Sequence, residues 1–144
     1  MKKKRVELQR LFTLEEATAQ LSWIQETLRV AQTELNNLYD TIVLHKRMYA
    51  IEYAERSPRE TELEQLLEGK IHAFESSVEK WVQRFADQGV LLRDIQKGIC
   101  NFPYKDAYGD MYFLLWQQGD SGILYFHEAE ESPIARKPIT LLPN

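Results

Sequence analysis

The sequence has little of what secreted, membrane-spanning and disordered proteins contain in quantity. Its 144 residues include one cysteine, Cys100, which excludes an intrachain disulfide and favours a reducing compartment. No apolar run approaches the roughly 20 residues of a membrane span, and no apolar core of a secretion signal follows the basic start. Hydrophobic residues at 44% and charged residues at 28% are ordinary for a globular chain and argue against disorder. We therefore expect one cytoplasmic globular domain.

Charge and motif content narrow the function classes further. The 18 Lys and Arg residues are outnumbered by 22 Asp and Glu residues, which gives no broad basic surface for nucleic acid. The chain lacks a Gly-rich phosphate loop, a nucleophile elbow, a Cys-x-x-Cys pair and the H-E-x-x-H zinc motif. These absences weigh against an enzyme, so we assign no catalytic residue, no metal ligand and no cofactor.

Capping signals predict two helices. Thr13 and Glu16 have the spacing of a capping box, and Ser57 with Glu60 forms a second one, with a proline at the first helical position. Gly89 is placed as a left-handed C-cap. We predict helix one over residues 13–56 and helix two over 57–89, joined as an antiparallel hairpin.

Helix one carries a seam of apolar residues at alternating steps of three and four. This spacing is typical of coiled coils, and helix two has a less regular counterpart. One seam residue, His45, is polar, and we interpret it as lying at the edge of the core. The seam consists of Leu14, Ala17, Leu21, Ile24, Leu28, Ala31, Leu35, Leu38, Ile42, His45 and Tyr49.

A second apolar stripe lies away from this seam. Trp23, Val30, Leu44 and Ile51 share one heptad position, interrupted at Asn37. One helix partner does not cover both stripes, which leaves the C-terminal segment or another subunit. A helix of about 40 residues also spans roughly 60 Å, more than a compact domain of this size. We predict a homodimer formed partly through these helices; a broken helix in a monomer and an unidentified protein partner are the alternatives.

The pattern changes to that of strands after Gly89. We predict strands over residues 90–95, 111–117 and 123–128, with the last two joined by a Gly-rich turn. A hairpin there is expected to place Trp116 opposite Tyr125 and Leu114 opposite His127, with both faces covered because both are largely apolar. Residues 90–131 then form a small sheet and 132–144 an extended tail. The predicted class is α+β: a long antiparallel helical hairpin followed by a small, mainly antiparallel sheet, in one domain of residues 1–144.

A set of polar residues falls within these apolar strands and loops: Asp94, Asn101, Asp120, His127, Glu128 and Arg136. They suit a buried hydrogen-bond network that ties the tail to the sheet. They equally suit a site that binds an anion, holds a metal or performs acid–base chemistry. Two functions therefore stay open: a non-catalytic structural or interaction module, and a small-ligand or metal-binding domain.

The chain also resembles a known family over nearly its whole length. Three ordered blocks carry the resemblance: Leu11-Phe12-Thr13-Leu14-Glu15-Glu16-Ala17; Gly89-Val90-Leu91-Leu92-Arg93-Asp94-Ile95 with Gly98-Ile99-Cys100-Asn101-Phe102-Pro103; and Leu114-Leu115-Trp116-Gln117-Gln118-Gly119-Asp120 with Tyr125-Phe126-His127-Glu128 and Arg136. These blocks are similar to those of a bacterial family known as domain of unknown function 2203, which implies no activity.

The resemblance departs at three positions. Asn101 stands where the family often has Asp, Leu115 where it often has Cys, and Asp120 where it often has Glu. If the family used a carboxylate and a thiol as metal ligands, Asn101 and Leu115 would break that site in this chain. A structural network tolerates such changes more readily.

Overall fold

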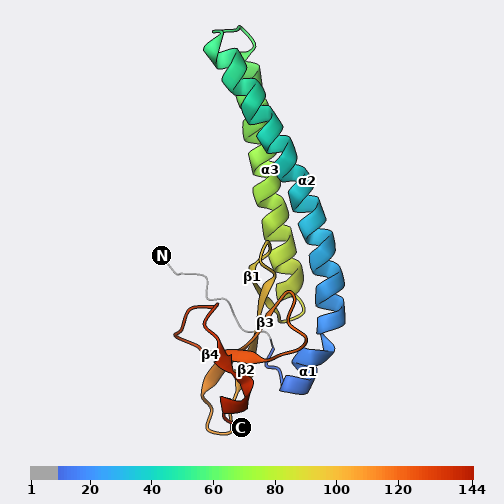
Figure 1. Ribbon diagram of the computed structural model, residues 1–144, viewed down its shortest axis with the longest axis vertical. Coiled ribbons are helices and arrows are strands. Elements are labelled where there is room, and N and C mark those ends of the chain that lie inside the picture. The colour runs from blue at the N-terminus through green and yellow to red at the C-terminus, as the bar shows by residue number, and fades with distance from the viewer. Residues whose placement is uncertain (1–9) are drawn as a thin grey trace. The chain divides into compact units, whose positions relative to one another are not determined.

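The computed structural model describes residues 10–144 and has three helices followed by five strands and a short 3₁₀ helix (Figure 1). The basic start of the chain lies outside these residues. The elements are α1 (Leu14–Ala19), α2 (Leu21–Ala54), α3 (Glu60–Ala86), β1 (Leu91–Asp94), β2 (Ile99–Lys105), β3 (Met111–Gln117), β4 (Tyr125–Glu128), β5 (Lys137–Pro138) and η1 (Ile139–Leu141). Long helices followed by an antiparallel sheet confirm the predicted α+β class.

The described chain forms two compact units. The sheet unit contains the residues up to Leu28 together with Val82–Asn144, and the hairpin unit contains Arg29–Trp81. The assignment of the whole chain to one domain stays a prediction. Within residues 10–144, none of the helices combines the length and the apolar character that crossing a membrane requires.

In the hairpin unit, α2 and α3 run side by side (Figure 1). The predicted seam faces inward: Ala31, Leu35 and Ile42 of α2 are buried, and so is Leu63 of α3. His45 is half-buried at the edge of this seam, where its Nδ1 lies 2.8 Å from the carbonyl oxygen of Thr41. The seam residues therefore pack the two helices together, as their spacing predicts.

A polar cluster also joins the two helices of the hairpin unit. The Glu34 carboxylate on α2 accepts hydrogen bonds from the Ser77 hydroxyl, from Trp81 Nε1 at 2.5 Å and from Lys80 Nζ at 3.0 Å. The hydrogen bonds from Ser77 and Trp81, with the nearby Lys80 charge, lower the pKa of Glu34 to about 2. Because only one relative position of α2 and α3 satisfies these donors, the cluster helps to fix the helix register.

The first predicted helix begins as expected but is interrupted. Thr13 forms the capping box: its hydroxyl accepts from the Glu16 N–H at 3.1 Å, and Glu16 Oε1 accepts from the Thr13 N–H at 3.0 Å. The single helix over 13–56 is nevertheless wrong, since α1 ends at Ala19 and α2 starts at Leu21. The Gln20 N–H bonds the Ala17 carbonyl at 3.1 Å, an i to i−3 bond that tightens the turn and ends α1.

The second predicted helix differs mainly at its start. The Ser57 hydroxyl accepts from the Arg59 N–H at 3.2 Å and not from that of Glu60, and α3 begins at Glu60. Its end matches the prediction: Gly89 has φ +81°, a conformation that favours glycine. The Val90 N–H bonds the Phe85 carbonyl at 3.0 Å, which completes a Schellman motif.

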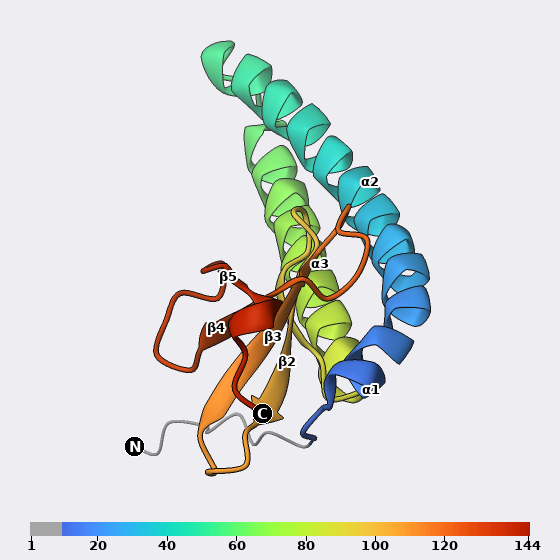
Figure 2. The same ribbon diagram turned by 60° about the horizontal axis from the view of Figure 1, so that its bottom comes forward.

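The five strands pair antiparallel in sequence order, β1-β2-β3-β4-β5 (Figure 2). β1 and β3 agree with the prediction, and β4 is shorter than the predicted strand over 123–128. β2 was not predicted, because Asn101 and Pro103 interrupt its apolar pattern. Pro103 is tolerated because β1 pairs with β2 only as far as Asn101, which leaves Pro103 with a strand neighbour on one side only.

The predicted register of the β3–β4 hairpin is wrong by one residue. Leu114 pairs with Phe126, and Leu115 pairs with Tyr125. Asp120 holds the connecting turn: its side chain accepts from the Gln117 N–H at 3.0 Å and its carbonyl from Trp116 Nε1 at 3.1 Å. These side-chain contacts, which the turn pattern alone does not reveal, fix the register.

Both faces of the central strands are buried, as expected. The first face carries Cys100, Phe102, Leu114, Trp116 and Phe126; the second carries Asn101, Pro103, Phe113, Leu115 and His127. The Phe12 ring packs edge-on against Phe102 on the first face, with centroids 5.3 Å apart. The predicted extended tail holds only β5 and η1 as regular structure, and Figure 2 shows the chain end beside β2.

Candidate functional site

The six predicted polar residues lie in the sheet unit but are divided among separate sets of contacts. Asn101 contacts His127, and Asp120 contacts Arg136. Glu128 belongs to a surface ion-pair group. Asp94 caps the turn after β1, where its Oδ1 accepts from the Lys97 N–H at 2.8 Å. The structure therefore does not bring the six together as one site.

The most buried of these sets is a cluster of Arg93, Asn101 and His127, which we call the Asn101 cluster. Asn101 is 0% and His127 is 1% exposed. Asn101 Oδ1 lies 3.1 Å from His127 Nε2 and accepts from Arg93 Nε at 3.0 Å. Its Nδ2 donates to the carbonyls of Cys100 at 3.2 Å and Pro133 at 3.4 Å. One amide thus joins β1, β2, β4 and the tail.

His127 is held in place on both sides of its ring. Nδ1 lies 2.8 Å from the Glu128 carbonyl oxygen, and the ring stacks on Phe113 with centroids 5.3 Å apart. Desolvation lowers the pKa of His127 and the Arg93 charge lowers it further, while the Glu128 carbonyl opposes the shift. A neutral ring has one proton for the two oxygens it faces, so it donates only one hydrogen bond at a time.

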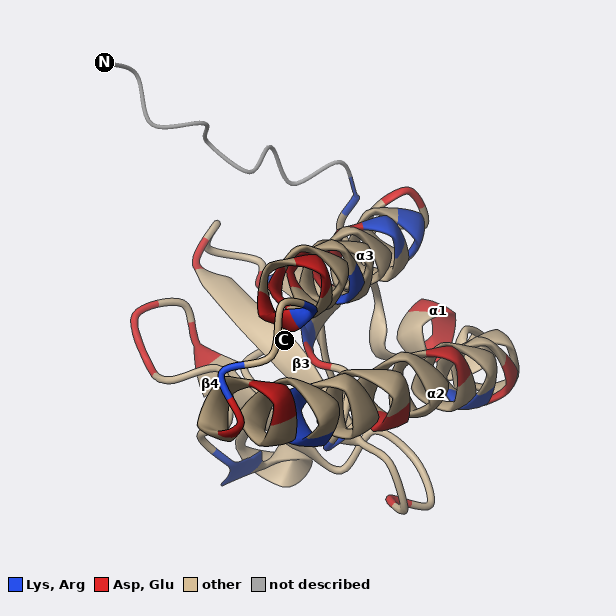
Figure 3. Cartoon of the chain, turned by 90° about the horizontal axis from the view of Figure 1, so that it is seen from above, with Lys and Arg blue, Asp and Glu red and all other residues tan. Residues whose placement is uncertain are grey.

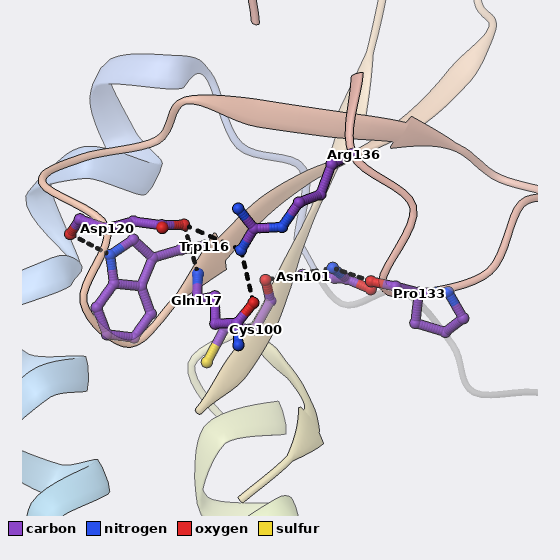
Figure 4. A network of polar contacts seen from close by, with 7 residues as sticks. All are labelled: Cys100, Asn101, Trp116, Gln117, Asp120, Pro133 and Arg136. Carbon is purple, nitrogen blue, oxygen red and sulfur yellow. Dashed lines mark hydrogen bonds and ion pairs between the residues drawn. The ribbon is translucent and has the colours of Figure 1, made fainter. Parts of the chain in front are cut away.

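The second set ties the tail to the β3–β4 turn (Figure 4). Arg136 Nη2 donates to Gln117 Oε1 at 2.6 Å and lies 3.6 Å from Asp120 Oδ2. The Arg136 guanidinium also lies over the Tyr125 ring, 4.5 Å from its centroid. Figure 4 marks contacts of the Asp120 carbonyl oxygen and of Oδ2 with Trp116, Gln117 and Arg136, which suit a structural role for this set.

Glu128 lies on the surface beside the tail. Lys137 Nζ lies 3.3 Å from Glu128 Oε1 and 3.1 Å from Glu131 Oε1. The Glu131 carboxylate also accepts from the Glu128 N–H at 2.8 Å. These contacts hold the turn between β4 and β5, and solvent screening makes each of them individually weak.

Cys100 is suited to packing and not to nucleophilic chemistry. It is 0% exposed, and burial raises the pKa of its thiol to about 12. Because the thiolate is the reactive form, this burial keeps the sulfur in its unreactive state at neutral pH. Cys100 therefore behaves as a small apolar residue of the sheet core.

Asn101 and Leu115, two positions at which the chain departs from the usual residues of the family, are neighbours in the structure. The two residues are cross-strand partners on β2 and β3, on the face that also carries His127. The Leu115 side chain has no donor atom for a metal, and an asparagine amide is not among the usual ligands of zinc. Nowhere in residues 10–144 do three His, Cys, Asp or Glu side chains come together in a group able to hold a metal ion.

Three of the four predicted interface residues are exposed. Val30 is 53%, Leu44 55% and Ile51 58% exposed, all on α2 in the hairpin unit. Trp23 lies instead in the sheet unit, half-buried, with its ring 5.0 Å from that of Phe85. The exposed stripe is therefore shorter than the sequence pattern indicates.

Sequence reasoning missed Arg93 and Glu34. Arg93 looks like an ordinary surface cation of an edge strand, yet its guanidinium lies over the Phe113 ring at 5.6 Å, and desolvation lowers its pKa. Glu34 is one of several carboxylates on α2, and nothing in the neighbouring sequence distinguishes it from the others. Both acquire their partners from other elements, so neighbouring sequence does not mark them.

The polar contacts as a whole can hold the strands and the tail together. Figure 3 shows basic and acidic residues mixed along both long helices.

A comparison with curated proteins and with solved structures finds no match to the chain. A family model described as "Uncharacterized conserved protein (DUF2203)" matches residues 10–139. The chain, which this match covers almost completely, belongs to the DUF2203 family.

Proposed function

We propose that the protein is a non-catalytic cytoplasmic module that self-associates through the exposed side of α2. The observation that carries this proposal is an exposed apolar stripe in the C-terminal third of α2, a helix of 34 residues. Leu44 and Ile51 are seven residues apart and more than half exposed, and Met48 between them is 37% exposed. Side chains at this spacing lie on one side of a helix, where a second helix can cover them.

The charges beside the stripe favour a second copy of the same helix. Asp40 lies four residues before Leu44 and Arg47 three residues after it, and both are exposed. Neither forms an ion pair with a residue of the described chain. A second α2 in the opposite direction, centred on Leu44, brings each Asp40 close to the other copy's Arg47. Such a surface is complementary to itself, as a two-fold interface must be.

The same pairing brings Asn37 opposite Ile51 of the second copy. Asn37 is the one polar member of the heptad series, and it is exposed. Polar residues within such a seam set register at a cost in stability. The pairing therefore predicts a dimer of moderate affinity, in which Asn37 limits the strength of association.

The test is the mass of the protein in solution. We expect sedimentation equilibrium to give twice the chain mass of 17.0 kDa and the variant Leu44→Glu/Ile51→Glu to give the single mass. Leu66→Glu, which changes a 46% exposed residue of α3, is the matched control and should remain dimeric. A wild-type protein that stays monomeric at high concentration would contradict the proposal.

Charge exchange tests the orientation. Asp40→Arg alone should weaken the dimer because it places two cations together, and Asp40→Arg combined with Arg47→Asp should restore it. A double variant as weak as the single one would exclude the antiparallel pairing about Leu44. Association lost equally in Leu66→Glu would move the interface away from the stripe.

The alternative function, binding of a metal or small ligand by the six polar residues, has weaker support. Both side-chain polar atoms of Asn101, both ring nitrogens of His127 and Oδ2 of Asp120 already have partners within the chain. A ligand at these atoms would have to replace internal hydrogen bonds, at a cost comparable to what it gains. A rise in melting temperature on adding a metal, lost in His127→Ala, would favour this alternative.

A further inference from the structure

A groove lies in the sheet unit between the end of α3 and the strands. Its volume is about 480 Å³, and its lining is mostly apolar: Val82, Gln83, Ala86, Val90, Leu91, Leu92, Arg93 and Phe113. Clefts of about 300–1,000 Å³ with few polar groups are typical binding sites for small molecules. The groove thus has the size and the surface to hold the apolar body of a ligand.

Arg93 supplies the charge in this groove. No carboxylate in residues 10–144 forms an ion pair with it, and its guanidinium lies over Phe113. Among its contacts with residues 10–144, the one hydrogen bond is from Nε to Asn101 Oδ1, at 3.0 Å. The two terminal nitrogens therefore retain N–H donors that can face a ligand.

The Asn101 cluster holds this cation in a fixed orientation. The Asn101 side chain is fully buried and contacts the Pro133 carbonyl and His127 as well as Arg93. A guanidinium oriented by buried partners loses less side-chain entropy when it binds an anion than a free surface arginine does. The buried polar residues thus orient Arg93 without having to contact the ligand.

We propose that this groove binds a small apolar carboxylic acid. Its carboxylate accepts two hydrogen bonds from the terminal nitrogens of Arg93, and its hydrocarbon body packs on Val82, Ala86 and Leu91. This proposal is independent of self-association, because none of these residues belongs to the α2 stripe. It differs from the alternative function above in that Arg93, and not the six predicted residues, contacts the ligand.

The probe is octanoate, which combines one carboxylate with a short aliphatic chain. We expect saturable binding in an NMR titration of the full chain, with amide shifts at residues 82–93. The neutral analogue octanamide should bind at least about tenfold more weakly, because it lacks the charge that Arg93 recognises. Equal affinities for the two compounds, or no saturable binding of octanoate at millimolar concentration, would overturn the proposal.

Two variants separate the charge from the groove. Arg93→Gln should weaken octanoate at least about tenfold, whereas the control Lys97→Gln on the neighbouring turn should change the affinity less than about twofold. Val82→Trp, at a position 38% exposed, should fill the groove and abolish binding while leaving the melting temperature unchanged. If Arg93→Gln and Lys97→Gln lowered the affinity for octanoate to a similar extent, the effect would come from the overall charge of the protein, and this would also overturn the proposal.

Discussion

The two units differ in where their exposed large apolar side chains lie. In the sheet unit, the exposed ones fall largely on loops and on the tail, as Tyr108, Ile134 and Leu141 do. In the hairpin unit, Leu44 and Ile51 are exposed on a regular helix, α2. Scattered exposed residues are normal on protein surfaces, whereas a repeated series on one side of a helix indicates a contact surface. The sheet unit therefore exposes its large apolar residues mainly outside regular elements, whereas the hairpin unit exposes a repeated series on one helix.

The largest expected difference concerns the cores. Trp116→Ala removes a side chain that is 0% exposed and should lower the free energy of unfolding by about 3–5 kcal/mol. Leu44→Ala should change it by less than about 0.5 kcal/mol when measured on dilute, dissociated protein. Urea denaturation measures both. Similar losses in the two variants would show that Leu44 is buried within the chain.

The Asn101 cluster should contribute the next largest effect. Asn101→Leu removes the acceptor of the Arg93 Nε–H and the oxygen that faces His127 Nε2, and should cost about 2–3 kcal/mol of unfolding free energy. Asn37→Leu, the same substitution on the exposed side of α2, is the matched control and should be nearly neutral in dilute protein. Should the two variants unfold at the same urea concentration, the cluster would have no structural role.

The free energy of unfolding should fall at low pH because of one carboxylate in the hairpin unit, that of Glu34. The pKa of Glu34 is lowered to about 2 from the ordinary 4.5, so its contribution is complete above the ordinary value and is lost as pH falls from there towards 2. Because Glu34 is partly exposed, solvent screening reduces this contribution to about 1–2 kcal/mol. Denaturation curves at a series of pH values should show this loss in the wild type and not in Glu34→Gln.

The exposed Glu79 of α3 provides the control for that experiment. Glu79→Gln should keep the acid dependence of the wild type. If Glu34→Gln retains the same dependence, the Ser77 and Trp81 hydrogen bonds do not lower the pKa as described.

The smallest expected effect is a gain in association. Asn37→Leu completes the heptad series and should tighten the proposed dimer by about 1 kcal/mol, or roughly fivefold, through added apolar contact. Sedimentation equilibrium of the variant beside the wild type measures the change. An unchanged dissociation constant would place residue 37 outside the interface.

Local signals made the helices predictable from the sequence. The Thr13 capping box and the Gly89 C-cap each involve residues within a few positions of one another, so the sequence contains both partners. The seam follows from the helical period for the same reason. The break at Gln20 escaped prediction because no glycine or proline marks it.

The sheet and the site were less predictable because their partners are distant. β2 exists because β1 and β3 supply its hydrogen bonds, although Asn101 and Pro103 weaken its own pattern. The β3–β4 register depends on how the Asp120 side chain folds back on Gln117. Arg93 became a candidate only when the fold brought Asn101 and Phe113 to it. The six polar residues were a sound guide to where polar contacts concentrate, but not to how they divide.

The order of the two units along the chain has a consequence for how the family can vary. The chain leaves the sheet unit at Leu28 and returns to it at Val82, so the hairpin unit is an insertion within the sheet unit. Lengthening or shortening α2 and α3 by matched numbers of turns changes the reach of the insertion while keeping the buried sheet intact. The length of the hairpin can therefore change without a change in the buried core of the sheet unit.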